Sequence, residues 1–397
     1  MIDQIPMTKC TGCQTCMEIC PAKAISFSDA SGSFLKPFLN KQLCFSCGAC
    51  LRVCPAIVPA ASYFPQEGYA AMGKDSNVIE ASASGGAFAV MAQAVAARDG
   101  IVFGAVLTED FHIQHESSEK VSITAMQGSK YAQSDMNHTM PEAAAFLKSG
   151  REVLFSGMPC QIAGLLSYLD QKQIPTDKLL TVDLICHGVP SASLFRRYKE
   201  HLEVKFHKQI AEIRFRNKQK YERGGFMMKI RFADGEVKWI FHSLDLYYRA
   251  FLRGYLYRES CYQCPYAQIR RVSDITIGDC NTYEDYRSIW PDKTISDIFI
   301  NTEKGCSFWE KIKDAFEYTR LDLEKERHGN TQLHRPSKQP SDYGQVLADF
   351  QKGEYGNAEK AAGLSLSLKE RLKMYIKSYV PWKLVERINA IKRIRKR

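Results

Sequence analysis

A doubled cysteine pattern near the amino terminus constrains this chain more than any other feature. Its two runs are Cys10, Cys13, Cys16 and Cys20 before Pro21, and Cys44, Cys47, Cys50 and Cys54 before Pro55. Both have the spacing C-x2-C-x2-C-x3-C-P, and they are offset by 34 residues. Two copies without a shared apolar pattern do not indicate a helical-repeat solenoid. The pattern points instead to paired metal clusters.

Three thiolates two residues apart lie on one tight loop and can hold three corners of a cubane cluster. In such runs the fourth cysteine ligates the other cluster. The spacing predicts one 4Fe–4S cluster on Cys10, Cys13, Cys16 and Cys54 and a second on Cys20, Cys44, Cys47 and Cys50. Zinc is the alternative, but zinc sites prefer paired C-x2-C knuckles to triplets with a distant fourth ligand. The pattern therefore favours a bacterial-type two-cluster ferredoxin fold.

Composition places this module in a larger globular protein. The 397 residues suggest two or three domains, and 45% hydrophobic with 25% charged residues excludes a disordered or fibrous chain. The first residues lack the basic and apolar regions of a signal peptide, and the most apolar stretch, 85–97, is too short to span a bilayer. We expect a cytoplasmic chain, in which cysteines serve metal or redox chemistry rather than disulfides.

The rest of the chain predicts a mixed α/β region. Apolar β-branched runs predict strands at 78–79, 101–107, 153–155, 179–185, 213–216, 226–232, 236–240, 275–277 and 298–300. Helices are predicted at 161–169, at 193–202 and, capped by Ser307, at 307–319. The fold class is thus a multidomain α+β and α/β chain. The expected domains are a ferredoxin domain (1–60), two parts of the α/β region (69–200 and 201–330) and a helical extension (341–397).

Four further cysteines suggest additional chemistry. Cys160 follows a strand, Cys186 ends one, and Cys261 and Cys264 form a C-x2-C pair before Pro265. We hypothesise that these four hold a third 4Fe–4S cluster. The alternative for Cys160 and Cys186 is a buried small hydrophobic residue. Cys280 and Cys306 are predicted to be core residues.

Two segments suit a phosphate or a flavin ring. Ser84-Gly85-Gly86 opens an Ala-rich helix, where glycines let backbone amides approach a phosphate. Close helix packing explains the same glycines equally well. Lys130 is the second candidate, with a solvated surface lysine as its alternative.

In order along the chain, these segments resemble a known family. The motifs are Ser84 to Phe88, Gly128 to Tyr131, Ser156 to Gln161, Asp183 to Ser191, Cys261 to Pro265 and Ser273 to Asp279. They resemble the beta subunits of coenzyme F-420 hydrogenases and dehydrogenases, above all the ferredoxin-fused bacterial members, and plant hydroxymethyl-chlorophyll reductase is a relative. The resemblance covers roughly residues 1–285. Met158 replaces the usual Thr, and Cys280-Asn281 replaces an aromatic pair, so substrate identity does not transfer.

The resemblance implies FAD bound by the α/β region, with clusters delivering electrons to it. By position, the flavin role falls on Ser84, Gly85, Gly86, Lys130, Gly157 and Gln161. The family's cluster-binding cysteines match Cys160, Cys186, Cys261 and Cys264. No catalytic acid or base is assigned. The expected function is an iron–sulfur flavoprotein oxidoreductase with a partner protein or small molecule as electron donor or acceptor. The alternatives are a non-catalytic electron-transfer subunit and an iron–sulfur scaffold or regulatory protein.

The carboxyl-terminal tail carries almost all of the net charge of +10. Residues 366–397 hold eleven Lys and Arg against two Glu, which is +9. Apolar residues at helical spacing on either side of Pro381 predict a basic amphipathic helix pair, which suits the anionic inner face of a membrane. A solvated helix packed on a partner subunit is the alternative. No nucleic-acid partner is expected, because no recognised nucleic-acid-binding fold is present.

Overall fold

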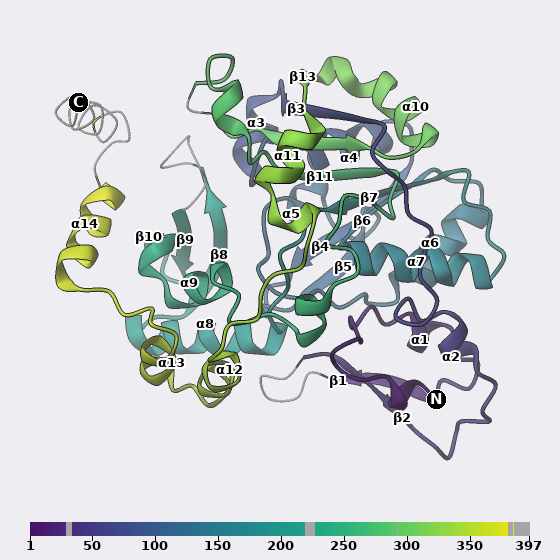
Figure 1. The fold of residues 1–397 in the computed structure, drawn as a ribbon, viewed down its shortest axis with the longest axis horizontal. Coiled ribbons are helices and arrows are strands. Elements are labelled where there is room, and N and C mark those ends of the chain that lie inside the picture. The colour runs from purple at the N-terminus through teal and green to yellow at the C-terminus, as the bar shows by residue number, and fades with distance from the viewer. Residues whose placement is uncertain (29–33, 219–226, 292, 380–383, 385–397) are drawn as a thin grey trace.

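A mixed eight-stranded sheet forms the centre of the protein (Figure 1). The computed structural model describes residues 1–28, 34–218, 227–291, 293–379 and 384. The strand order is β13-β3-β12-β11-β7-β6-β4-β5, with β4, β6, β7 and β11 parallel and the outer strands antiparallel. The strands are β3 (Glu67–Gly73), β4 (Ile101–Leu107), β5 (Ile113–Ser117), β6 (Val153–Gly157), β7 (Leu179–Leu184), β11 (Ile275–Asp279), β12 (Ser296–Ile300) and β13 (Phe316–Arg320).

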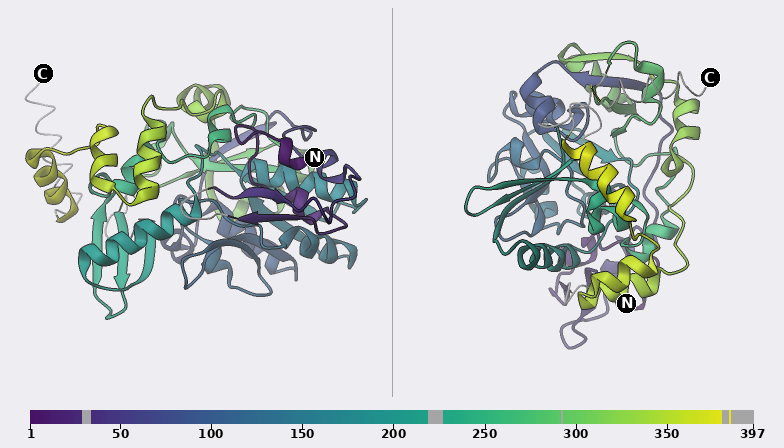
Figure 2. Two further views of the ribbon diagram at one scale, coloured as in Figure 1. Left: turned by 90° about the horizontal axis from the view of Figure 1, so that it is seen from below. Right: turned by 90° about the vertical axis from the view of Figure 1, so that its left-hand side faces the viewer.

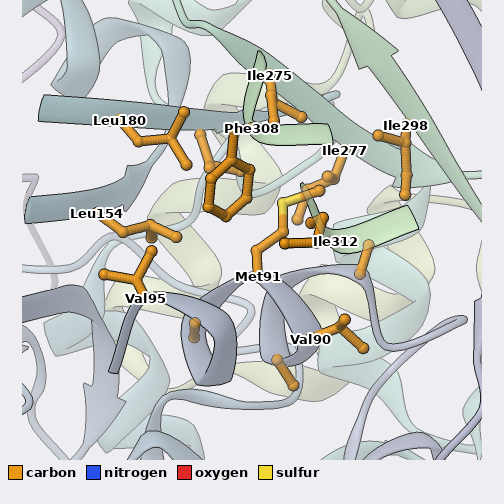
Figure 3. Close-up of a cluster of buried hydrophobic side chains, with 14 of the residues drawn as sticks. Val90, Met91, Val95, Leu154, Leu180, Ile275, Ile277, Ile298, Phe308 and Ile312 are labelled. Carbon is orange, nitrogen blue, oxygen red and sulfur yellow. The ribbon is translucent and has the colours of Figure 1, made fainter. Parts of the chain in front are cut away.

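Helices cover both faces of this sheet, so its central strands are apolar on both sides. On one face, α4 (Ala87–Ala96) and α10 (Glu303–Ile312) pack on alternate residues such as Leu154 and Ile298 (Figure 3). On the other face, α6 (Thr139–Lys148) and α7 (Pro159–Gln171) pack on the intervening residues, including Phe155. The carboxyl ends of the parallel strands then meet at one edge, where loops can form a site.

The amino-terminal module is small and rests on the second face. It contains η1 (Ile2–Gln4), α1 (Thr15–Glu18), α2 (Ala49–Arg52) and an antiparallel pair, β1 (Ile25–Ser28) with β2 (Lys36–Leu39). The cysteine loops bend at Gly12 and Gly48, whose φ angles of 68° and 73° favour glycine. Apolar residues of α1 and α2 share one core with α6 and α7, so the module is packed against the sheet region.

A second lobe completes the described chain. Its three-stranded antiparallel sheet has the order β10-β9-β8 and packs on α8 and α12. The lobe contains β8 (Ile210–Asn217), β9 (Met227–Phe232), β10 (Val237–Phe241), α8 (Ala192–Phe206), α9 (Leu246–Leu252), α12 (Tyr343–Lys352) and α13 (Tyr355–Ala361). The amino-terminal module and α14 (Leu368–Tyr379) lie at opposite ends of the molecule (Figure 2).

The remaining short elements connect these parts. They are α3 (Ser76–Ala81), α5 (Ile123–Met126), α11 (Leu323–Gly329), η3 (His242–Leu244), η4 (Glu259–Gln263), η5 (Tyr283–Tyr286), η6 (Lys313–Ala315) and η7 (Thr331–Leu333). Among the described residues, no helix is long and apolar enough to cross a membrane.

Two of the predicted elements are wrong. The predicted strand at 78–79 belongs to α3, which begins where the Asp75 side chain accepts a hydrogen bond from Asn77 N–H. The predicted helix at 307–319 is shifted and too long. Helix α10 is capped by Thr302 rather than Ser307 and ends at Ile312, and 316–320 forms the edge strand β13. Pairing with β3 and packing of Tyr318 on Tyr69 override the helical pattern there.

The predicted mixed α/β class and the antiparallel strands between 210 and 241 are confirmed. The central sheet draws strands from both halves of the predicted α/β region. The tail includes helix α14, while Trp382 and all basic residues beyond 379 lie outside the described residues.

Candidate iron–sulfur and cofactor site

The first cysteine group joins both cysteine runs. Cys13 and Cys16 are buried. Burial raises the pKa of Cys16, and the thiolates of Cys13, Cys10 and Cys54 raise it further. Burial together with Cys13 and Cys10 also raises the pKa of Cys54 to about 11. Buried thiols that oppose one another's ionisation fit a cationic iron cluster, because metal ligation deprotonates them.

The second cysteine group lies nearer the surface. Cys47 is exposed, whereas Cys50 is buried beside it and has a raised pKa, chiefly from burial and partly from the Cys47 thiolate. Cys20 accepts a hydrogen bond from Ala24 N–H at 3.3 Å, and Cys44 is half-buried. A cluster on this group would lie close to solvent and to any partner protein.

The third cysteine group gathers at the carboxyl ends of β6 and β7. Cys160 lies in the first turn of α7, Cys186 follows β7, and Cys261 and Cys264 lie in and after η4. The pKa of Cys160 is well above its usual value, first because of burial and then because of Cys264, Cys186 and Cys261. Backbone groups at Gly188 and Val189 hydrogen-bond the sulfurs of Cys186 and Cys261 and favour their thiolates. Four mutually adjacent thiols with such partners fit a 4Fe–4S cluster.

A buried ion pair holds the loop that supplies two of these cysteines. Arg271 donates to Asp183 at 3.1 Å and to the Leu184 carbonyl at 3.0 Å, with both charged side chains almost fully buried. The same guanidinium donates to carbonyls of Tyr266 and Gln268. It therefore ties the chain after Cys264 to the end of β7.

The ferredoxin module packs against α7, the helix that carries Cys160 of the third group. A Cβ atom added at Gly164 of α7 would lie 3.2 Å from Cys13 Cβ and 3.3 Å from its sulfur. Cys13 also contributes to the raised pKa of Cys160. The first and third cysteine groups are thus neighbours across α7, and Gly164 provides the clearance.

Polar side chains hydrogen-bond the ferredoxin module to the rest of the chain, and no sequence pattern predicted them. Arg258 is buried and donates to the carbonyls of Cys10 and Leu35, both at 2.6 Å, and to Gln133 at 3.1 Å. Gln133 in turn donates to the Thr11 carbonyl at 3.0 Å. Only proximity to the C-x2-C pair, three residues later, marked Arg258 in the sequence.

The predicted flavin residues fall into two sets. Gly157 and Gln161 lie at the end of β6, where Gln161 accepts from Met158 N–H at 2.9 Å and donates to Ser134 at 3.0 Å. His115 lies against them. Its Nε2 is 3.0 Å from the Ser156 carbonyl, its Nδ1 has no partner among the described residues, and burial lowers its pKa to about 4.

Lys130 is half-buried, and its ammonium faces the backbone. Its ammonium donates to the carbonyls of Ala125, Met126 and Gln127 at 3.1, 2.7 and 2.8 Å, so it caps the end of α5. Burial and the charge of Arg214 lower its pKa to about 7, while the three carbonyl acceptors favour its charged form.

The second set, Ser84-Gly85-Gly86, is wedged between strands. Ser84 donates to the Ile295 carbonyl at 2.8 Å, and Gly85 N–H donates to Ser296 at 2.9 Å. A Cβ atom at Gly85 would lie 2.7 Å from Ser296 N. Close packing therefore accounts for Gly85, while Gly86, with φ of 84°, begins α4.

An ion pair connects the flavin-predicted residues. Arg216 and Asp279 form a salt bridge, and Ser84 hydrogen-bonds Asp279. The positive charge of Arg216 also favours the ionised form of the Tyr131 phenol, next to Lys130. The Arg216–Asp279 pair thus lies between the Ser84 loop and the segment of Lys130 and Tyr131.

Comparisons with known proteins agree with this geometry. Residues 9–58 match the 4Fe-4S dicluster domain, so the amino-terminal module is that of an iron–sulfur electron-transfer protein. Residues 150–326 match the family model for the C terminus of the coenzyme F420 hydrogenase/dehydrogenase beta subunit. The resemblance to that beta-subunit family is thus confirmed over this part of the chain.

Among solved structures, the chain is similar to one in the F420-reducing [NiFe] hydrogenase complex from Methanosarcina barkeri. The identity is 17%, the match covers 76% of this chain and 92% of that chain, and the TM-score is 0.46. No curated protein sequence matches the chain.

Proposed function

We propose that this protein is an iron–sulfur flavoprotein oxidoreductase in which 4Fe–4S clusters exchange electrons with a bound FAD. One observation carries the proposal: the first turn of α7 holds Cys160 and Gln161 side by side. Cys160 interacts with the third cysteine group and with Cys13, while Gln161 lies in the predicted flavin region. A single turn of helix thus joins the two redox centres.

Each part of the chain has a role in this scheme. The ferredoxin cysteines hold two clusters, and Cys160, Cys186, Cys261 and Cys264 hold a third. FAD, when bound, supplies the conversion between hydride transfer and single electrons. Gln161 and the Ser84–Gly86 loop orient it, and Arg216 supplies positive charge for its phosphates. His115 stays neutral at pH 7 because its pKa is about 4.

Iron and flavin content test the proposal. Anaerobically purified protein is expected to hold about 12 iron atoms per chain and releasable FAD, with Cys160→Ser falling to about eight. Cys306→Ser is the matched control, because Cys306 lies outside all three groups and should leave the iron count unchanged. A wild-type count of about eight that Cys160→Ser does not change would refute the third cluster. Iron-replete protein that binds no FAD would refute the flavin.

The exposure of Cys47 favours a second candidate, a subunit that only transfers electrons to another chain. A cluster at the surface is reachable by a redox partner protein, and single-electron exchange needs only close approach. Reduction of the isolated, FAD-loaded protein by a nicotinamide or deazaflavin donor favours the enzyme. Turnover that requires a second chain favours the transfer subunit.

The exposed face of α14 supports binding to an anionic membrane surface. Leu368 and Leu372 are 87% and 62% exposed, and Lys369 and Lys373 are also exposed. A basic helix with exposed leucines suits the lipid interface. We therefore place the protein in the cytoplasm, at the inner membrane face.

A further inference from the structure

Three acidic side chains from distant segments meet at the end of the central sheet, and none of them belongs to a cysteine group described above. Cys280 follows β11, Asp297 lies on β12, and Glu326 lies on α11. One ligand atom from each lies within 4.8 Å of the other two. Asp297 and Glu326 are fully buried, and Cys280 is half-buried.

Their hydrogen bonds are unequal. Glu326 accepts from Asn281 N–H at 3.1 Å and from the N–H and hydroxyl of Thr282 at 2.9 and 2.7 Å. Neither carboxylate oxygen of Asp297 has a hydrogen-bond partner outside this trio among the described residues. An unpartnered carboxylate at such depth costs several kcal/mol unless another group meets it.

The charges around Asp297 make this cost larger. Burial raises its pKa well above the usual value, and the carboxylates of Glu326 and Asp279 raise it further. Burial also raises the pKa of Cys280, and the Asp297 carboxylate raises it further. The groups acting most strongly on Asp297 are therefore acids, and a cation would relieve all of them.

We propose that Cys280, Asp297 and Glu326 bind a divalent transition-metal ion of the zinc class. One thiolate and two carboxylates are ligands that Zn²⁺ accepts, whereas Mg²⁺ and Ca²⁺ take oxygen ligands alone. Three protein ligands leave a fourth position for water. The N–H groups of Asn281 and Thr282 already orient Glu326, as partners of metal ligands do.

The alternative to a metal ion is a proton shared between the side chains, which would leave one carboxylate oxygen poorly hydrogen-bonded. One proton between Asp297 and Glu326 leaves the second Asp297 oxygen facing only a thiol, which is a weak donor. A single ion faces all three side chains. Its route in is through Cys280, the partly exposed member.

The site shares no residue with the region predicted for FAD. Side chains alternate across a strand, so Ser296, which binds Gly85, and Asp297 point to opposite faces of the sheet. Asp297 lies on the face of Phe299, which packs in a core with Trp290 and Leu333. The inference therefore does not rest on the proposed flavin.

Zinc binding to the cluster-loaded protein tests the inference. Equilibrium dialysis against Zn²⁺, with zinc and iron counted in the same sample, is expected to give about one zinc per chain at unchanged iron content. Asp297→Asn and Cys280→Ser should each weaken zinc binding by about 100-fold or more. Cys306→Ser should bind zinc like the wild type. Zinc should also raise the Tm of the wild type and not that of Asp297→Asn, because the ion ties α11 to the sheet.

Several results would overturn the site. If the wild-type protein takes up no zinc at full iron content, this result alone refutes the site, and no variant is needed. Zinc that appears only as iron is lost belongs to the cysteine clusters. If the wild type and Asp297→Asn bind equal amounts of zinc per chain, and their Tm values show that both are folded, the ion binds elsewhere.

Discussion

Replacing Arg258 with Met should detach the ferredoxin module and lower the potential of its first cluster. Arg258 is 1% exposed and serves three acceptors, the carbonyls of Cys10 and Leu35 and the amide of Gln133. Met keeps an unbranched apolar stem but removes every donor, so three buried acceptors lose their partner.

The structure sets the size of the effect. A hydrogen bond from a charged donor contributes about 1.5–3 kcal/mol, so the loss of three such bonds costs about 4.5 kcal/mol at the lower end. Arg258 Nη2 also lies 3.7 Å from the sulfur of Cys10. Removing a positive charge there makes addition of an electron less favourable, and the reduction potential of the cluster falls.

Two assays on one sample measure these effects. Denaturant unfolding gives the loss of stability, and a redox titration followed by electron paramagnetic resonance gives the potential. Arg253→Met is the matched control, because Arg253 is exposed and lies five residues away. The reasoning is refuted if Arg258→Met unfolds within about 1 kcal/mol of the wild type and its clusters titrate at unchanged potentials.

Three other changes give separate tests. Gly164→Ala places a Cβ atom 3.3 Å from the Cys13 sulfur, so we expect the ferredoxin module to dock more weakly. Stopped-flow spectroscopy should then show slower electron transfer to the third cysteine group. Gly344→Ala is the control, because a Cβ atom there meets open space. Burial lowers the pKa of His115 from 6.5 to about 4 in the folded state, so as the pH falls below 6.5 the unfolded state binds a proton that the folded state does not. The unfolding free energy should fall by about 2 kcal/mol from pH 7 to pH 5, and a His115→Gln variant with the same slope would contradict this. Leu368→Ser with Leu372→Ser should reduce sedimentation with anionic vesicles, whereas salt-insensitive and equal binding by both proteins would exclude α14 as the contact.

The local patterns of the sequence predicted much of the fold. Continuous apolar runs predicted β4, β6 and β7, because strands buried on both faces need apolar residues throughout. Edge elements were harder. β13 has a helical pattern in Phe316–Arg320 but pairs with β3, a choice that depends on a strand more than 240 residues away.

The candidate site divides in the same way. Cysteine spacing predicts the ligands of the ferredoxin module, because each run supplies three thiols on one tight loop and the fourth ligand of the other cluster. The grouping of Cys160, Cys186, Cys261 and Cys264 was a hypothesis about three separate segments. The structure brings their thiols together, and their role as cluster ligands stays a prediction.

The sequence by itself determined the iron–sulfur module and the resemblance to the beta-subunit family, since both depend on short motifs with fixed spacing. Tertiary structure alone decided that α7 stands between the first and third cysteine groups and that Arg258 locks them together. It also decided that Cys280, Asp297 and Glu326 meet. The physical reason is that each of these contacts joins residues far apart in the chain. Sheet order and helix packing bring such residues together, and no local pattern records either.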